Sequence, residues 1–354
     1  MLFPLLLANT AAAQVRVKLE TSGKPDALTQ QVLRLGQDAT RPQAMAKLIE
    51  AGRPAVSLLL RAVVTEDALS MPALRTLAEM GGMARPAVPG LQALGRKKTP
   101  LGDAARRAVA AIGERDSVVF CDWSKNCIFE LDAAGAKLRE VQVNSPWCVQ
   151  VVEDDHLLVC CYNDDRVREI DWDGKEIASW EAKGPIWARR QLDGTMWVSE
   201  HKNKTVQRRA MDGKVITEVK CQARTCVIGL NDNVFLLEDT GKLREVTAAG
   251  DAVREMTLQN QPLALFLSPA GEIRVLYAES LVTLDAKGEL AVEDKSTGGM
   301  AYVATVDGVR FLGRNGSLKR QDAKGKDVWQ FPCGLPSCIV PRLLPADGLP
   351  ADGR

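Results

Sequence analysis

The hydrophobic and polar positions of this chain follow two different periods. Between residues 26 and 115, alanines and leucines recur at helical spacing, as in AMAKLIEAGRPAVSLLLRAV (44–63). From residue 116 onward, short runs alternate apolar and polar positions, as in FELDAAGAKLREV (129–141), which is typical of half-buried strands. The pattern therefore predicts a multidomain chain with a helical part at 26–115 and an all-β part at 116–345.

The β part contains a repeat. A glycine in the same alternating phrase recurs about every 38 residues, and each copy lies between two short strands. A repeat of this length built from short strands is typical of a β-propeller, with one four-stranded blade per repeat. Six copies predict six blades, and their glycines are Gly135, Gly174, Gly213, Gly250, Gly288 and Gly325.

The ring is expected to close through its C-terminal segment. The array begins with the second strand of its first blade, so residues 338–344 are predicted to pair beside residues 117–121 and to remove the exposed sheet edges. Each expected inner strand carries one small residue, which suits the crowding of inner strands around a central channel. These residues are Cys148, Ala188, Cys226, Ala264, Ala301 and Cys338.

The helical part also repeats. The phrase PAV occurs at 54–56 and again at 86–88, and each proline suits the first turn of a helix. Paired helices at this period resemble HEAT-like repeats, with alanines that let helices approach and leucines that fill the seam. The resemblance implies a short α-solenoid.

The ends of the chain have a different composition. In residues 1–13 an apolar run precedes three alanines, which predicts a secretory signal peptide, with a linker at 14–25. The protein is therefore expected in the periplasm or at the cell surface. No other apolar run approaches the length of a membrane span, and the net charge of +1 argues against a nucleic-acid partner. Residues 346–354 are predicted to be a disordered tail.

Cysteines occur in pairs that flank short segments. Cys221 and Cys226 have the same spacing as Cys333 and Cys338, which predicts local disulfides in an exported protein. Two further pairs flank expected hairpin turns and are predicted to bond likewise: Cys121–Cys127 and Cys148–Cys160. The alternatives are a bond between the adjacent Cys160 and Cys161, and reduced thiols that serve as small apolar residues. No metal site is expected, because the chain has no Cys-x-x-Cys motif.

Two repeats carry a family resemblance. The segments at 146–181 and 185–218 resemble the blades of exported bacterial propellers classed as quinoprotein-like, NHL-like or arylsulfotransferase-like. The matching residues are Pro146, Trp147, Val167, Glu169, Asp171, Asp173, Gly174, Lys175, Trp187, Arg190, Gly194 and Glu200. The resemblance covers about 230 residues and implies the propeller fold. It implies no function, because these residues are the ones that build a blade.

One set of side chains is a candidate binding site. Aromatic and charged residues occur at equivalent positions near the inner strands of the first three blades, and they are expected at the mouth of the channel. They are Trp147, Trp187, Arg189, Arg190, Glu200 and His201. Packing between blades is the alternative explanation for the tryptophans.

The leading functional hypothesis is a non-catalytic binding or scaffolding protein with a protein, peptide or glycan partner. No motif combines a nucleophile, a base and an orienting group, so no catalytic residue is assigned. No cofactor is expected either, because quinone-dependent propellers have larger rings. The alternative is a sulfotransferase- or lyase-like enzyme that uses His201 with Arg189 or Arg190. A fully buried His201 would eliminate that alternative.

Overall fold

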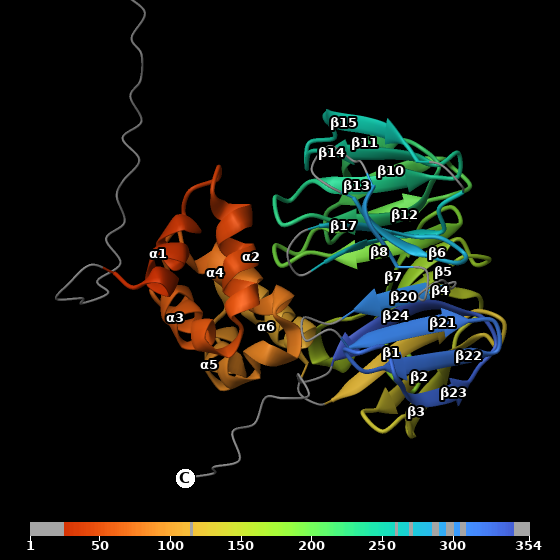
Figure 1. Ribbon diagram of the computed structural model, residues 1–354, viewed down its shortest axis with the longest axis horizontal. Helices are drawn as coiled ribbons and strands as arrows, with labels where there is room; N and C mark the ends of the chain where they lie inside the picture. Colours follow the sequence, from red (N-terminus) through yellow and green to blue (C-terminus); the bar gives the residue numbers. More distant parts are fainter. Residues whose placement is uncertain are drawn as a thin grey trace, which may run out of the picture.

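The computed structural model describes residues 25–113, 116–258, 261–268, 272–284, 290–294, 301–304 and 309–342. The predicted signal peptide and tail lie outside the described residues, as do Gly288 and all but the last residue of the predicted linker. The described part contains an N-terminal group of helices followed by a six-bladed β-propeller (Figure 1). The predicted fold class is therefore confirmed.

The helical part is built from short amphipathic helices around one aliphatic core. Fully buried leucines fill this core, and fully buried alanines such as Ala104 and Ala108 let α6 approach its neighbours closely. Gly52 has a φ of 67° and lets α2 end where α3 begins. The helices are α1 (Ala27–Arg34), α2 (Arg41–Ala51), α3 (Arg53–Val64), α4 (Ser70–Glu79), α5 (Val88–Gly95) and α6 (Pro100–Ile112), with a 3-10 segment, η1 (Gly81–Ala87), before α5.

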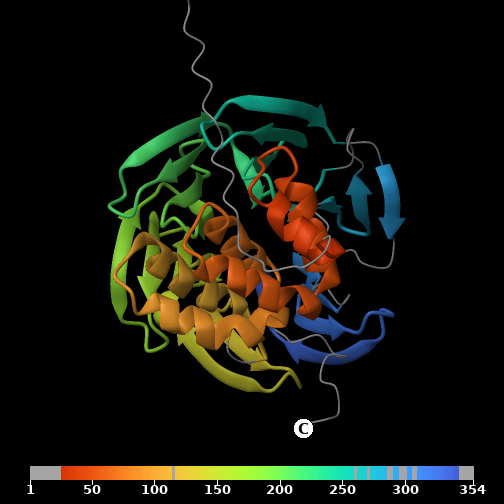
Figure 2. The ribbon, with the colours of Figure 1, turned by 90° about the vertical axis from the view of Figure 1, so that its left-hand side faces the viewer.

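The propeller consists of six four-stranded antiparallel sheets arranged around an axis (Figure 2). Blade 1 contains β24 (Pro336–Arg342), β1 (Ser117–Asp122), β2 (Cys127–Asp132) and β3 (Lys137–Gln142). Blade 2 contains β4 (Pro146–Val151), β5 (Leu157–Cys161), β6 (Arg166–Ile170) and β7 (Glu176–Glu181), with a 3-10 turn, η2 (Glu153–Asp155), after β4. Blade 3 contains β8 (Pro185–Arg190), β9 (Met196–Glu200), β10 (Thr205–Arg209) and β11 (Val215–Lys220).

The remaining blades have the same strand order. Blade 4 contains β12 (Ala223–Ile228), β13 (Val234–Glu238), β14 (Lys242–Val246) and β15 (Ala252–Thr257). Blade 5 contains β16 (Ala264–Leu267), β17 (Ile273–Leu276), β18 (Leu281–Leu284) and β19 (Leu290–Asp294). Blade 6 contains β20 (Ala301–Ala304), β21 (Arg310–Arg314), β22 (Ser317–Gln321) and β23 (Asp327–Pro332). The five described repeat glycines have φ angles between 81° and 91°, which explains why glycine recurs at these hairpin turns.

The first and last strands close the ring as predicted. β24 pairs antiparallel with β1, with Phe120 opposite Ile339 and Cys121 opposite Cys338. The C-terminal strand therefore supplies the inner strand of blade 1, whose other strands follow the helices in sequence. Of the predicted closing segment 338–344, the last two residues lie outside the described residues.

A buried carboxylate holds the closing strand in place. Asp122 has no exposed surface, and its side chain accepts hydrogen bonds from the backbone nitrogens of Gly334 (2.5 Å) and Leu335 (3.0 Å). It also accepts one from the Ser124 hydroxyl at 2.9 Å. Burial alone would raise the pKa of Asp122, but the two backbone donors outweigh it and hold the pKa below the ordinary value of 3.8. The ionised side chain is thus the acceptor that joins the end of β1 to the start of β24.

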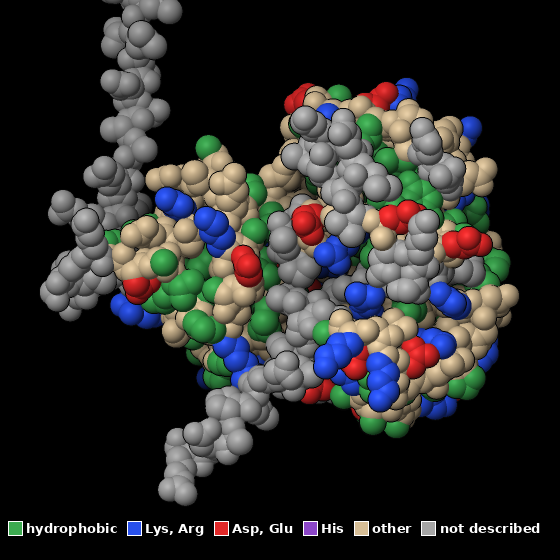
Figure 3. All heavy atoms as spheres, in the orientation of Figure 1, with side chains coloured by type: hydrophobic (Ala, Val, Ile, Leu, Met, Phe, Trp, Pro, Cys, Tyr) green, Lys and Arg blue, Asp and Glu red, His purple; other side chains and the backbone are tan. Residues whose placement is uncertain are grey.

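The helices lie across one face of the ring (Figure 2). Arg75 of α4 donates to the carbonyl oxygen of Gly229 at 2.7 Å and forms an ion pair with Asp232, both in the turn before β13. Leu230 of the same turn is buried in the helical core. On the surface seen in Figure 3, basic and acidic side chains are interspersed.

We expect Asp122→Asn to lower the free energy of unfolding by about 2 kcal/mol at pH 7, because a charged acceptor of several hydrogen bonds becomes neutral. The pKa of Asp122 is lowered on folding, so its contribution is complete above 3.8. The contribution is lost as the pH falls through the pKa of the folded protein. Denaturation curves at a series of pH values measure both effects.

The matched control is Asp132→Asn. Asp132 also accepts two backbone hydrogen bonds, at 2.8 Å and 2.9 Å, but both donors belong to the hairpin turn between β2 and β3 and not to the closing segment. An Asp122→Asn protein as stable as this control at pH 7 would contradict the assigned role.

Candidate functional site

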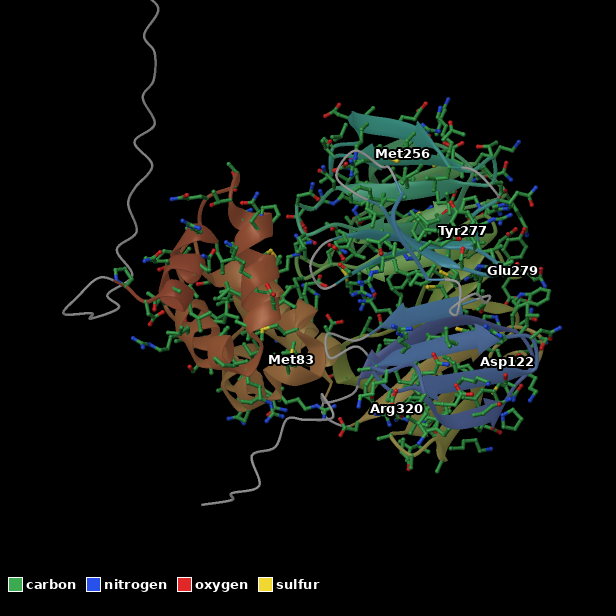
Figure 4. The ribbon with its side chains drawn as sticks, viewed as in Figure 1. Met83, Asp122, Met256, Tyr277, Glu279 and Arg320 are labelled. Carbon is green, nitrogen blue, oxygen red and sulfur yellow. The ribbon has the colours of Figure 1, made fainter. Side chains whose placement is uncertain are left out.

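The propeller presents two different faces. Each inner strand runs toward the helices: β4 begins at Pro146, and Glu153, which follows its end, accepts a hydrogen bond from Arg107 of α6 at 2.8 Å. The starts of the inner strands and the ends of the second strands therefore lie on the other face, which we call the distal face. Figure 4 shows Asp122, Tyr277 and Glu279 on this side, away from the helices.

The six predicted site residues do not form one cluster. Glu200 lies opposite Pro185 at the distal end of β8, with His201 next in sequence, and Trp147 lies near the distal start of β4. Arg190 lies opposite Met196, at the end of β8 that faces the helices. Glu200 and Arg190, which the sequence analysis placed in one site, thus lie at opposite ends of the β8–β9 strand pair.

A row of aromatic rings crosses the distal face of blades 1 to 3. The ring centroids of Trp123 and Trp147 are 5.9 Å apart, and those of Trp147 and Tyr162 are 5.7 Å apart. The row continues from Tyr162 to His201 at 6.3 Å, and Lys202 Nζ lies 5.1 Å from the centroid of the tyrosine ring. All four rings are partly exposed. We call Trp123, Trp147, Tyr162 and His201 the aromatic row.

The sequence analysis missed two members of the aromatic row, Trp123 and Tyr162. Trp123, Tyr162 and His201 each directly follow the second strand of their blade, so they occupy equivalent positions. Asp239 and Tyr277 stand at this position in blades 4 and 5. Alignment of the repeats on their second strands, in place of the hairpin glycines, would have revealed the row.

His201 is oriented by neighbours from blade 4. Its Nε2 lies 2.9 Å from Asp239 Oδ2 and 3.2 Å from the side-chain nitrogen of Gln222. Burial would raise the pKa of Asp239, but hydrogen bonds from His201 and from Arg224 lower it. The His201 side chain is 27% exposed, so the imidazole is accessible from solvent and chemistry at His201 is not eliminated by burial.

The other two predicted residues at the distal end have packing roles. Glu200 is buried and forms an ion pair with Arg209, and it accepts a hydrogen bond from Asn203 at 2.8 Å. Trp187 packs against two hydrophobic cores, one with residues of blades 2 and 3 and the other with residues of blades 3 and 4. Packing between blades thus explains why a tryptophan occurs at position 187.

A buried ion-pair network lies under the helices. Arg190, whose side chain is 4% exposed, donates to Glu169 Oε2 at 2.6 Å and to Glu153 Oε2 at 3.2 Å. Glu153 also bonds to Arg107, and Glu169 lies 3.1 Å from His156 Nδ1. The network links blades 2 and 3 to α6, which gives Arg190 a structural role.

The exposed Arg189 lines a cleft of about 360 Å³ between the helices and the ring. Apolar residues of α4, including Pro72 and Ala78, line the helical side. Part of the predicted site therefore lies in an interdomain cleft and not at the distal mouth of the channel.

The predicted disulfides are not formed in the structure. All nine cysteines lie among the described residues, and all are free thiols. Cys221 precedes β12, which contains Cys226, and Cys333 precedes β24, which contains Cys338. Neither pair is bonded.

The two hairpin pairs fail for different reasons. Cys127 lies opposite Asp122, and Cys121 lies opposite Ile128, so the two thiols point to opposite faces of the sheet. Cys148 does lie opposite Cys160, but its Sγ is 3.5 Å from the Sγ of Cys338. The structure of the described residues therefore matches the alternative interpretation, in which the cysteines are reduced thiols that serve as small apolar residues. No group of ligands for a metal ion occurs in the described residues.

Comparison with known proteins supports the fold. No known protein family and no curated protein matches the sequence. A protein of unknown function from Bacteroides caccae is similar in structure, with a TM-score of 0.54 and 17% identity over 64% of this chain and 98% of that one. A streptogramin B lyase gives 0.49 and 14% over 61% and 79%, and the WD40 propeller domain of Doa1 gives 0.42 and 15% over 48% and 60%. At these identities the likeness concerns the fold alone.

The ion-pair network generates a prediction. We expect Arg190→Ala to lower the free energy of unfolding by about 3 kcal/mol, because the buried Glu169 loses its guanidinium partner. The neighbouring Arg189→Ala is the control and should change it by no more than about 0.5 kcal/mol, since Arg189 is exposed. Chemical denaturation followed by circular dichroism measures both. Equal effects of the two substitutions would be inconsistent with this division of roles.

Proposed function

We propose that the protein is a non-catalytic binding module that recognises a protein or peptide partner on the distal face of the propeller. The observation that carries the proposal is the aromatic row of Trp123, Trp147, Tyr162 and His201, which spans three blades with partly exposed rings. Tryptophan and tyrosine are the residues in which the binding energy of protein interfaces concentrates.

The aromatic row is suited to binding because it is held in place before a partner arrives. Each ring contacts the next, and Trp147 also packs against the hydrophobic core of blades 2 and 3. Side chains already fixed in position lose little conformational entropy on binding, which leaves more of the contact energy for affinity.

Polar groups border the row. Gln222 and Asp239 lie beside His201, and the Lys202 ammonium group lies over the Tyr162 ring. Together they offer hydrogen-bond donors and acceptors. A peptide backbone needs both kinds of partner. We favour a protein or peptide over a glycan as the ligand because tryptophan and tyrosine anchors concentrate binding energy in protein interfaces.

The helical part fits a scaffolding role. Residues 25–113 contain no phenylalanine, tryptophan or tyrosine and offer no large aromatic anchor. Their attachment to the opposite face leaves the aromatic row uncovered by any described helix.

The arrangement disfavours the enzymatic alternative. A sulfotransferase- or lyase-like site would need His201 beside Arg189 or Arg190, and these arginines lie toward the other end of β8. His201 has the carboxylate of Asp239 beside it instead, which orients the ring without supplying a cation for a substrate.

We further propose the periplasm or the cell surface as the location. The support is the composition of residues 1–13, where an apolar run precedes small residues in the manner of a cleaved signal peptide. None of the described helices is long and apolar enough to cross a membrane.

The binding proposal is tested with peptides selected on the wild-type protein from a random library. We expect the Trp147→Ala/Tyr162→Ala double variant to bind these peptides at least tenfold more weakly, because two anchors are lost. Titration calorimetry or fluorescence anisotropy measures the affinity.

Trp180→Ala is the matched control. Trp180 is also partly exposed, but it lies on the outer strand β7, where its Nε1 donates to Met211 at 3.0 Å. This variant should bind as the wild type does. Affinity that is unchanged in the double variant, or a glycan array that shows binding dependent on these rings where peptides show none, would refute the proposal.

A further inference from the structure

Two thiols meet where the ring closes. Cys338 lies on the closing strand β24 of blade 1, and Cys148 lies on β4, the inner strand of blade 2. Their Sγ atoms are 3.5 Å apart, although 190 positions separate the residues in sequence. This sulfur contact joins the closing strand of blade 1 to the inner strand of blade 2.

The contact follows from the symmetry of the ring. Each inner strand carries one small residue at an equivalent position, and inner strands of neighbouring blades lie close together around the axis. Blades 1 and 2 are neighbours that both have cysteine there. The third cysteine at this position, Cys226 of blade 4, lies between blades that carry Ala188 and Ala264.

We propose that Cys148 and Cys338 form a disulfide that closes the ring covalently when the protein meets a disulfide-bearing oxidant. One thiolate attacks a sulfur of the oxidant and forms a mixed disulfide, and the second thiolate then displaces the oxidant from it. The two cysteines lose two protons and two electrons in total, and the disulfide of the oxidant is reduced to two thiols, one released at each step. The sulfur atoms need to approach from 3.5 Å to about 2.05 Å for the bond to form.

Access and thiol acidity set when the bond forms. Cys148 is 8% exposed, and the neighbouring Cys160 thiol together with burial raises its pKa to about 12. The contact with Cys148 and burial raise the pKa of Cys338 well above the ordinary value of 9.0. Few thiolates exist in the folded ring, so exchange there is slow. The bond therefore forms as the closing strand docks, and the same burial then protects it from reductants.

The bond would reinforce the junction on which the propeller depends. β24 is held to β1 by hydrogen bonds of a single strand pair, and Asp122 fixes its start. A covalent link to blade 2 restricts the unfolded chain over 190 positions, and stabilisation of this kind grows with loop length.

The test refolds the reduced, unfolded full chain in a buffer that contains reduced and oxidised glutathione. After the remaining thiols are blocked, digestion without reductant should yield a cross-linked peptide pair containing Cys148 and Cys338 as the main product. When the same chain is refolded with dithiothreitol in place of the glutathione pair, its Tm should be lower by roughly 10 °C.

Three variants make the outcome specific. Cys148→Ser and Cys338→Ser should each abolish the cross-link and the Tm difference. Cys226→Ser should retain both, because Cys226 occupies the equivalent position without a cysteine in either neighbouring blade. A main product that links Cys148 to Cys160 or Cys333 to Cys338, nine thiols that remain free, or a Tm unaffected by dithiothreitol would each overturn the proposal.

Discussion

The pairing of β24 with β1 is the interaction on which the rest of the structure depends. Blade 1 obtains its inner strand only when segments from the two ends of the propeller pair with one another. The buried Asp122 joins those ends by accepting backbone hydrogen bonds from residues 334 and 335. The thiol contact at Cys338 requires that this strand is in place, and Trp123, the first member of the aromatic row, donates its backbone hydrogen bond to the carbonyl oxygen of Leu335 just before it.

The helices and the propeller are connected by charge as well as by packing. Arg75 and Arg107 reach from the helices to turns of the ring, and the pairing of Arg107 with Glu153 leads directly to the buried Arg190. Buried ion pairs are weak sources of net stability but strict geometric constraints, because a misplaced partner leaves a charge unpaired. The network thus fixes the helices on one face and leaves the aromatic row on the other.

The sequence was sufficient for the fold and insufficient for the site. Hairpin glycines and alternating strands repeat at constant intervals, so the number of blades and the closing strand could be predicted. The direction of each side chain depends on register, which the repeat of glycines does not define. For this reason Arg190 was expected in a site but is buried in an ion-pair network, and the partly exposed Trp187 packs between blades. Trp123 and Tyr162, in contrast, were missed. The cysteine pairs were predicted from spacing alone, which does not define the face of the sheet to which each thiol points, as at Cys121 and Cys127.

The place of the closing strand in the chain has a consequence for biosynthesis. β24 is the last described strand, and it completes the blade whose other three strands are the first to be made after the helices. During translation, blade 1 therefore waits with an open edge until residues 336–342 have left the ribosome. Any nascent or prematurely terminated chain that lacks residues 336–342 exposes this edge, so a chaperone that shields unpaired strands would act on blade 1 first.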